Sequence, residues 1–108
     1  MTTMPYRELS PKQAQQELQR DPSLKLLDVR TPPEYEDYRL KGCVLLPLQE
    51  LPRRFRELDA NANWLIYCEA GVRSQMACEF LASAGFTKLA NLTGGIAHWI
   101  DDGLPHKR

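Results

Sequence analysis

The sequence predicts a three-layer α/β domain in which a small parallel sheet of about five strands lies between helices on both faces. Three observations support this prediction. Short apolar runs alternate along the chain with segments of helical periodicity. The runs show little polar alternation, as expected for strands buried on both faces. The 108 residues are 43% hydrophobic, enough for one core, and contain no linker or repeat, so we expect a single domain over residues 1–108.

The first two predicted elements are a helix and a strand. Ser10 can cap a helix, Pro11 suits the first helical position, and Gln13 can complete a capping box. The helix should run to about residue 20, where an Asp-Pro pair breaks it. Residues 24–29 form an apolar run, which predicts a buried strand.

The middle of the chain predicts two short helical segments around a strand. Thr31, two prolines and Glu34 repeat the capping pattern for a short helix through about residue 38. Residues 43–46 are an apolar strand. Residues 48–58 place apolar side chains at helical spacing but contain Pro52, which predicts a helical turn followed by a short helix.

The last third of the chain predicts two strand and helix pairs. Residues 64–67 and 88–92 read as strands, and residues 74–84 and 96–102 as helices that each end at a glycine. Parallel sheets bind ligands beyond the carboxyl ends of their strands. The segment that follows residue 67 is therefore the predicted position of a functional site.

Composition excludes several function classes. Fourteen basic residues balance fourteen acidic ones, so we expect no binding to nucleic acid or to an anionic membrane. No apolar run approaches the roughly 20 residues of a membrane span. Residues 1–8 lack the apolar stretch of a secretory signal, and we expect a cytoplasmic protein. Three cysteines at unrelated spacings and two unpaired histidines predict reduced thiols and no metal.

One cysteine stands where local structure could make it reactive. Cys68 follows the strand at 64–67, and a short loop joins it to the helix that begins near Ser74. Loop N–H groups, the helix dipole and the charge of Arg73 all favour an anion there, so we expect Cys68 to react as a thiolate. A strand-end cysteine is more often a packing residue, and this is our interpretation of Cys43 and Cys78.

Three segments together resemble the rhodanese-type sulfurtransferase family. The family's active loop, C-x-x-G-x-R-S, is matched by Cys68-Glu69-Ala70-Gly71-Val72-Arg73-Ser74. Its early segment is matched by Leu27-Asp28-Val29-Arg30 with Glu34-Tyr35. Its closing motif is matched by Leu92-Thr93-Gly94-Gly95, Trp99 and Gly103-Leu104-Pro105. The matches occur in the family's order and cover nearly the whole chain, so they are far more specific together than any one motif.

The resemblance implies a rhodanese-like fold and a double-displacement reaction. The Cys68 thiolate would take a sulfane sulfur from thiosulfate or a persulfide and pass it, from a Cys68 persulfide, to cyanide or a thiol. The outer sulfur would be bound by the loop residues Glu69, Ala70, Gly71, Val72, Arg73 and Ser74. No cofactor is implied. We expect small sulfur donors and acceptors or a persulfide-carrying protein as partners, and a monomer or weak dimer.

Asp28 and Arg30 are expected to support the loop. An arginine in the first turn of a helix opposes the helix dipole, so Arg73 should have an acidic partner. Asp28, at the end of a neighbouring predicted strand, is our candidate, as the resemblance also suggests. The two histidines, His98 and His106, are expected on the surface.

Two alternatives remain open. Phosphatases and arsenate reductases of similar fold place one more residue between cysteine and arginine, so the four residues found here favour a persulfide over phosphate. The other alternative is a rhodanese-fold module that binds or regulates a protein without turnover. The joint presence of Cys68, Gly71 and Arg73 weighs against it.

The chain departs from the family pattern at two places. Tyr38-Arg39-Leu40 stands where the family usually has Gly-His-Ile, and Glu69 places a carboxylate in the loop where many relatives carry a neutral or basic residue. Because this carboxylate should repel thiosulfate, we expect weak use of that donor. A persulfide donor would fit the loop better.

Overall fold

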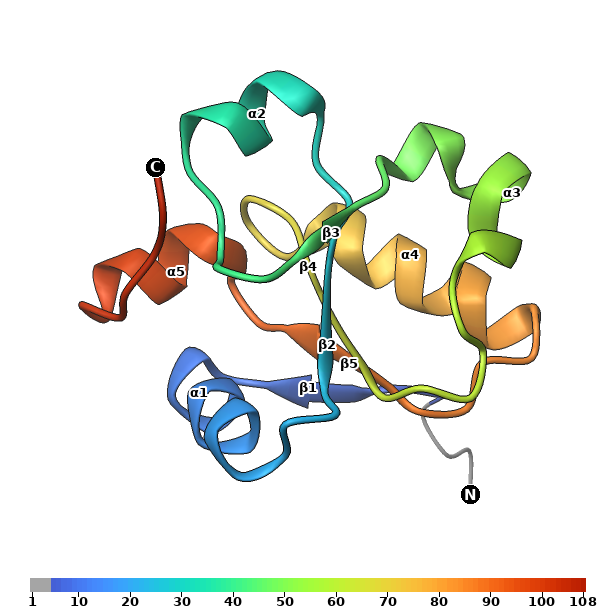
Figure 1. The fold of residues 1–108 in the computed structure, drawn as a ribbon, viewed down its shortest axis with the longest axis horizontal. Helices are drawn as coiled ribbons and strands as arrows, with labels where there is room; N and C mark the ends of the chain where they lie inside the picture. The colour runs from blue at the N-terminus through green and yellow to red at the C-terminus, as the bar shows by residue number, and fades with distance from the viewer. Residues whose placement is uncertain (1–4) are drawn as a thin grey trace.

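The computed structural model describes residues 5–108, which form a five-stranded sheet covered by helices (Figure 1). The strand order is β1-β5-β4-β2-β3, and every neighbouring pair is parallel. The strands are β1 (Arg7–Leu9), β2 (Lys25–Asp28), β3 (Val44–Leu45), β4 (Trp64–Tyr67) and β5 (Leu89–Leu92). Residues 1–4, part of the segment expected to lack a secretory signal, lie outside the described residues.

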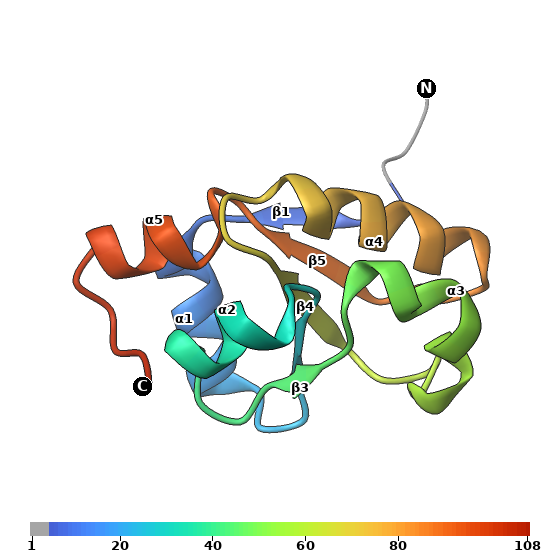
Figure 2. The ribbon, with the colours of Figure 1, turned by 90° about the horizontal axis from the view of Figure 1, so that it is seen from above.

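Within residues 5–108, four α-helices connect successive strands, a fifth follows β5, and two 3₁₀ turns flank α3. They are α1 (Pro11–Arg20), α2 (Pro32–Asp37), η1 (Leu48–Glu50), α3 (Leu51–Arg54), η2 (Phe55–Glu57), α4 (Val72–Ser83) and α5 (Gly95–Asp101). Figure 2 shows α1 and α5 on one side of the sheet and α3 and α4 on the other. The α/β fold with helices on both faces is therefore confirmed.

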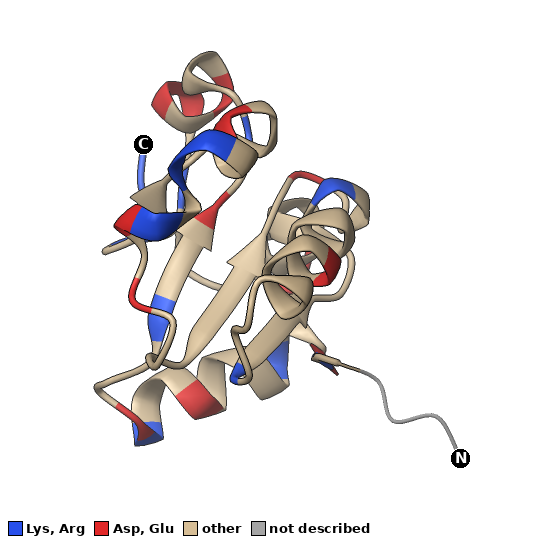
Figure 3. Cartoon of the chain, turned by 90° about the vertical axis from the view of Figure 1, so that its right-hand side faces the viewer, with Lys and Arg blue, Asp and Glu red and all other residues tan. Residues whose placement is uncertain are grey.

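The sheet separates two apolar cores. Leu27 and Ile66 pack on the side of α3 and α4, whereas Leu26 and Leu65 pack on the side of α1 and α5. This alternation along β2 and β4 explains why their sequences are continuously apolar, since both faces of each strand are covered. The central strand β4 and its neighbour β5 carry no charged residue, and charge is found mainly on helices and loops (Figure 3).

Both predicted helix caps are present. The Gln13 N–H donates to Ser10 Oγ at 3.2 Å, and the Ser10 N–H donates to Gln13 Oε1 at 2.9 Å. Thr31 and Glu34 form the same reciprocal capping box at the start of α2. A capping box satisfies backbone donors that the first turn of a helix leaves free, which is why these short sequences begin helices where predicted.

Three predictions of local structure need correction. The strand β1 was not predicted, because its three residues include the exposed Arg7 and Glu8 and it pairs with β5 alone at the sheet edge. The strand expected at 43–46 is only two residues long, and Val44 is 46% exposed. The helix expected from residue 74 begins at Val72, so its first turn is part of the cysteine loop.

None of the helices within residues 5–108 combines the length and the apolar character that crossing a membrane requires. The helix α2 is unusual in another respect, because it contributes no buried residue. Its position relative to the sheet must depend on polar contacts, and these lie beside Cys68.

Candidate active site

Three hydrogen-bonding groups converge on the sulfur of Cys68. The N–H groups of Gly71 and Ser74 donate to Cys68 Sγ at 3.1 and 3.3 Å, and Ser74 Oγ lies 3.3 Å from it. Cys68 is 1% exposed and directly follows β4 at the carboxyl end of the sheet. Fixed N–H donors in a site without bulk water stabilise negative charge on the atom they face.

Gly71 gives the loop the backbone geometry that this arrangement needs. It is the N-cap of α4 and has φ of +96°, a left-handed conformation that side chains disfavour. A Cβ added there would also lie 3.0 Å from the backbone nitrogen of Gly94. The glycine therefore turns the loop sharply and lets its backbone approach the neighbouring segment.

The start of α5 supports the loop from the other side. The N–H groups of Ile96 and Ala97 donate to the carbonyl oxygens of Cys68 and Glu69 at 2.9 and 3.0 Å. Gly95 packs so closely that an added Cβ would overlap the carbonyl group of Glu69. Gly95 was not among the residues expected at the site, although the Gly94-Gly95 pair of the closing motif is a usable signal.

Arg73 pairs with Glu34, and the predicted partner Asp28 is wrong. The two guanidinium nitrogens of Arg73 donate to the two carboxylate oxygens of Glu34 at 2.7 and 2.8 Å. This contact joins α4 to α2, which lacks buried residues. The Arg73 hydrogen bonds, aided by those from Thr31, hold the pKa of Glu34 at about 2.

Asp28 instead forms an ion pair with Arg30, two residues further along the chain. Both side chains are fully buried, and Arg30 Nη2 lies 2.8 Å from Asp28 Oδ2. Burial lowers the pKa of Arg30, but the hydrogen bonds and charge of Asp28 outweigh it and raise the pKa overall. Arg30 also donates to the Tyr38 carbonyl at 2.6 Å and to Glu69 Oε1 at 3.3 Å. Arg30 thus links β2 to the cysteine loop.

Tyr38 and Glu69, which both depart from the family pattern, contact each other. The Tyr38 hydroxyl donates to Glu69 Oε2 at 2.5 Å. This hydrogen bond, followed by burial, raises the pKa of Tyr38 to about 12. The Glu69 carboxylate is therefore held between Arg30 and Tyr38, and a residue that seemed an isolated change is part of a network.

None of the remaining candidates forms a hydrogen bond to the Cys68 sulfur within the described residues. Ala70 and Val72 are exposed on the loop, and Val72 is 64% exposed. Cys78 is buried as expected, and burial raises the pKa of its thiol to about 12. Cys43 is half-buried, and the Tyr67 hydroxyl donates to its sulfur at 3.3 Å. Of the two histidines expected on the surface, His98 is exposed, and His106 is half-buried.

The fold and the site define a class of protein in which a cysteine is surrounded by loop N–H groups at the carboxyl edge of a parallel sheet. Within this class the chain matches the rhodanese-like domain family over residues 10–102. It belongs to that family, so the resemblance of its motifs is confirmed.

Individual relatives agree with this assignment. A sulfurtransferase of Allochromatium vinosum is 38% identical over 80 residues, which cover 74% of this chain and 75% of that protein. A putative sulfur carrier protein of Bacillus subtilis, YrkF, is 38% identical, with 85% of this chain matched to half of that protein. A crystal structure of a rhodanese-related protein from Thermoplasma volcanium superposes with a TM-score of 0.86 at 28% identity, covering 94% of this chain and 97% of that one. The family and these names support a role in sulfur transfer.

The ion pair between Arg73 and Glu34 predicts a specific acid sensitivity. Because the folded pKa of Glu34 lies at about 2, below an unfolded value of about 4.5, the unfolded chain takes up this proton first as pH falls. The stabilisation is fully present above about pH 5 and is lost as the pH falls towards about 2. Glu34→Gln should reduce the free energy of unfolding near neutral pH and make it decline less with acidification.

Urea unfolding at about pH 6.5 and about pH 3 measures this difference. Glu36→Gln is the matched control, because Glu36 lies exposed on the same helix and forms no ion pair within the described residues. Equal declines for Glu34→Gln and the unmodified chain would contradict the assigned role of the pair.

Proposed function

We propose that the protein is a rhodanese-type sulfurtransferase that carries sulfane sulfur on Cys68 as a persulfide. The convergence of the Gly71 and Ser74 N–H groups on the Cys68 sulfur is the observation that carries this proposal. The Cys68 thiolate attacks the sulfane sulfur of a donor and forms a bond to it. The rest of the donor leaves with the electron pair of the broken bond. A thiol or cyanide acceptor then attacks the outer sulfur and regenerates the Cys68 thiolate.

The first turn of α4 offers further donors to the outer sulfur. The N–H groups of Val72 and Arg73 make no hydrogen bond within the described part of the chain, as expected at the start of a helix. They belong to the same turn as the Ser74 N–H, which faces the Cys68 sulfur. Negative charge on a persulfide would therefore be stabilised by fixed dipoles, and the mechanism assigns no step to a metal or a histidine.

Phosphate chemistry is less well supported by the same loop. Only four residues separate Cys68 from Arg73, one fewer than in phosphatases and arsenate reductases, which makes a narrower ring. In addition, both terminal nitrogens of Arg73 are engaged by Glu34. An arginine held in this way positions the loop and is not free to bind two oxygens of a phosphate.

Glu69 bears on the choice of sulfur donor. Asp28 and Glu69 both form ion pairs with Arg30, and the three side chains together carry two negative charges and one positive charge. The Glu69 carboxylate is 34% exposed, so this excess negative charge can act on a molecule that approaches the loop. The Glu69 carboxylate repels a dianionic donor such as thiosulfate more strongly than a persulfide group, which carries at most one negative charge. We therefore propose a persulfide as the preferred donor.

Mass spectrometry of the intact protein tests the proposal directly. After incubation with an organic persulfide donor, the chain should gain one sulfur atom, and peptide mapping should place that atom on Cys68. Cys68→Ser should gain none, whereas Cys78→Ser should be loaded as the unmodified chain is, because Cys78 is buried and lies outside the loop. Addition of a thiol should then remove the extra sulfur.

A chain that stays unmodified under these conditions would rule out the enzymatic proposal. It would favour the alternative of a rhodanese-fold module that binds a protein without turnover.

Glu69→Gln should improve the use of thiosulfate. This change removes one negative charge beside the loop while it keeps a side chain of the same size. The Michaelis constant for thiosulfate should fall by roughly threefold to tenfold, as expected for loss of a partly screened repulsion. Steady-state transfer to cyanide measures the constant.

Salt provides an independent control for this prediction. Added salt should lower the Michaelis constant of the unmodified chain more than that of Glu69→Gln, because screening acts on the charge that the variant lacks. If thiosulfate saturates the unmodified chain at micromolar concentration, the repulsion argument is wrong.

A further inference from the structure

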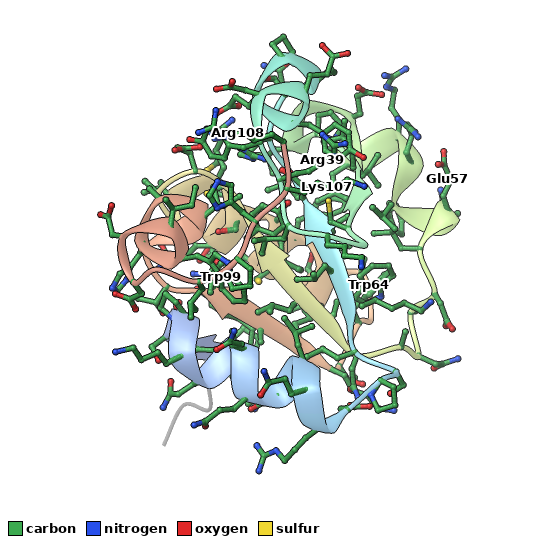
Figure 4. All side chains as sticks on the ribbon, turned by 60° about the vertical axis from the view of Figure 1, so that its left-hand side comes forward. Arg39, Glu57, Trp64, Trp99, Lys107 and Arg108 are labelled. Atoms are coloured by element: carbon green, nitrogen blue, oxygen red, sulfur yellow. The ribbon has the colours of Figure 1, made fainter. Side chains whose placement is uncertain are left out.

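A group of basic side chains lies close to the cysteine loop and has no role in the proposed reaction. We call Arg39, Lys41, His106, Lys107 and Arg108 the basic corner. Arg39 and Lys107 form an antiparallel bridge, with backbone hydrogen bonds of 2.8 and 2.7 Å in the two directions. Figure 4 shows the C-terminal segment with Lys107 and Arg108 passing beside Arg39. Lys41, Pro105, His106 and Lys107 line a hollow of about 360 Å³ at this corner.

The two segments of the basic corner are held in place by the fold. Trp99 is buried, and its indole N–H donates to the Pro105 carbonyl at 2.8 Å. The Arg39 guanidinium donates to the Tyr35 carbonyl at 3.2 Å and lies 4.7 Å from the centre of the Tyr35 ring. A charged partner would therefore meet a surface whose backbone is already ordered, which reduces the entropy lost on binding.

The charges of the basic corner are not neutralised within the described chain. Arg7, Arg30, Arg54 and Arg73 each form an ion pair with a carboxylate elsewhere in the structure. Among residues 5–108, by contrast, no carboxylate lies within 4.0 Å of a side-chain nitrogen of Arg39, Lys41 or Lys107. Arg39, Lys41 and Lys107 thus bring three unpaired positive charges together at one corner of a chain whose net charge is zero.

The basic corner connects to the active loop through one side chain. The His106 ring packs edge-to-face against the Tyr38 ring, with 6.1 Å between the ring centres. The other end of Tyr38 donates its hydroxyl to Glu69, the residue after Cys68. The surface therefore carries the negative charge of Glu69 beside the Cys68 loop and the positive charge of the basic corner on the other side of the Tyr38 ring.

This charge separation selects for a particular kind of partner. Thiosulfate carries its charge on the sulfur-bearing group itself, so Glu69 repels it before the basic corner can help. A partner whose sulfur group carries less charge than thiosulfate, and whose negative region lies elsewhere, could satisfy both parts of the surface. The basic residues come from two antiparallel segments, so they match a run of carboxylates better than a single compact anion.

We propose that the basic corner binds an acidic segment of the protein that delivers sulfur to Cys68. The proposal rests on the proposed function of Cys68. The carboxylates of the segment contact Lys41 and Lys107, while a persulfide elsewhere on the same partner enters the loop. The Cys68 thiolate attacks the terminal sulfur of the partner's R–S–SH group. A sulfur–sulfur bond forms to Cys68, the original bond breaks, and R–S⁻ leaves with its electron pair.

Two synthetic donors test the proposal. Each is a peptide with one cysteine persulfide and a neutral spacer, followed by a short run of glutamates in one peptide and of glutamines in the other. At low salt the acidic peptide should load Cys68 about tenfold faster at limiting concentration, because opposite charge accelerates encounter. High salt should remove the preference.

The variant Lys41→Ser/Lys107→Ser should lose this preference and should load from the neutral peptide at the unmodified rate. Arg53→Ser/Arg56→Ser is the matched control. Both arginines are exposed on the α3 side of the molecule, and they should not affect the preference. An equal preference in all three proteins, or none in the unmodified chain, would overturn the proposal.

Binding of a persulfide-free glutamate peptide separates this proposal from the proposed function. Chemical-shift changes confined to the basic corner would support the acidic-segment site even if Cys68 were not loaded by either donor. Absence of binding, or displacement of the peptide by equal concentrations of inorganic phosphate or oligouridylate, would contradict it. Displacement by phosphate would identify a site for a simple anion, and displacement by oligouridylate would identify a site for RNA.

Discussion

The site depends on one packing constraint: the backbone of the Cys68 loop must meet the start of α5 with no side chain between them. Gly71 and Gly95 are the two residues that permit this approach. It allows the loop carbonyls to accept N–H groups from α5, while the loop N–H groups remain directed at sulfur. Donors fixed in this way need no reorganisation when charge develops on the atom they face. The anion site is thus a consequence of how two segments pack.

Three ion pairs then fix the surroundings of the loop. Arg30, buried with Asp28, extends to Glu69, and Arg73 engages Glu34 on α2. Removing one partner of a buried pair leaves an uncompensated charge, which costs several kcal/mol, so the parts of this network depend on one another. Because α2 contributes no buried side chain, its placement relies on such contacts. The same charges that hold the structure also determine which donors can approach sulfur.

Much of this arrangement could be predicted from the sequence. Caps at Ser10 and Thr31, apolar strands and the C-x-x-G-x-R-S loop have local signals, and the α/β fold follows from their alternation. Pairing between distant segments has no such signal, which is why the partner of Arg73 was assigned to the wrong carboxylate. The edge strand β1 was missed because its exposed charged residues hide its pattern. The contact between Tyr38 and Glu69 became visible only when the fold brought residues 31 positions apart together.

Substitution of Gly95 tests the packing constraint most directly. Gly95→Ala would place a Cβ against the Glu69 carbonyl, whereas Gly103→Ala shares the strain of a positive φ but has no atom within 4 Å of its added Cβ. The measurement is the rate of sulfur loading on Cys68 from an organic persulfide. Gly95→Ala should slow loading by more than about tenfold, as expected when fixed donors of an anion are displaced, and Gly103→Ala should remain close to the unmodified rate. Equal loading rates in a folded Gly95→Ala protein would contradict the account.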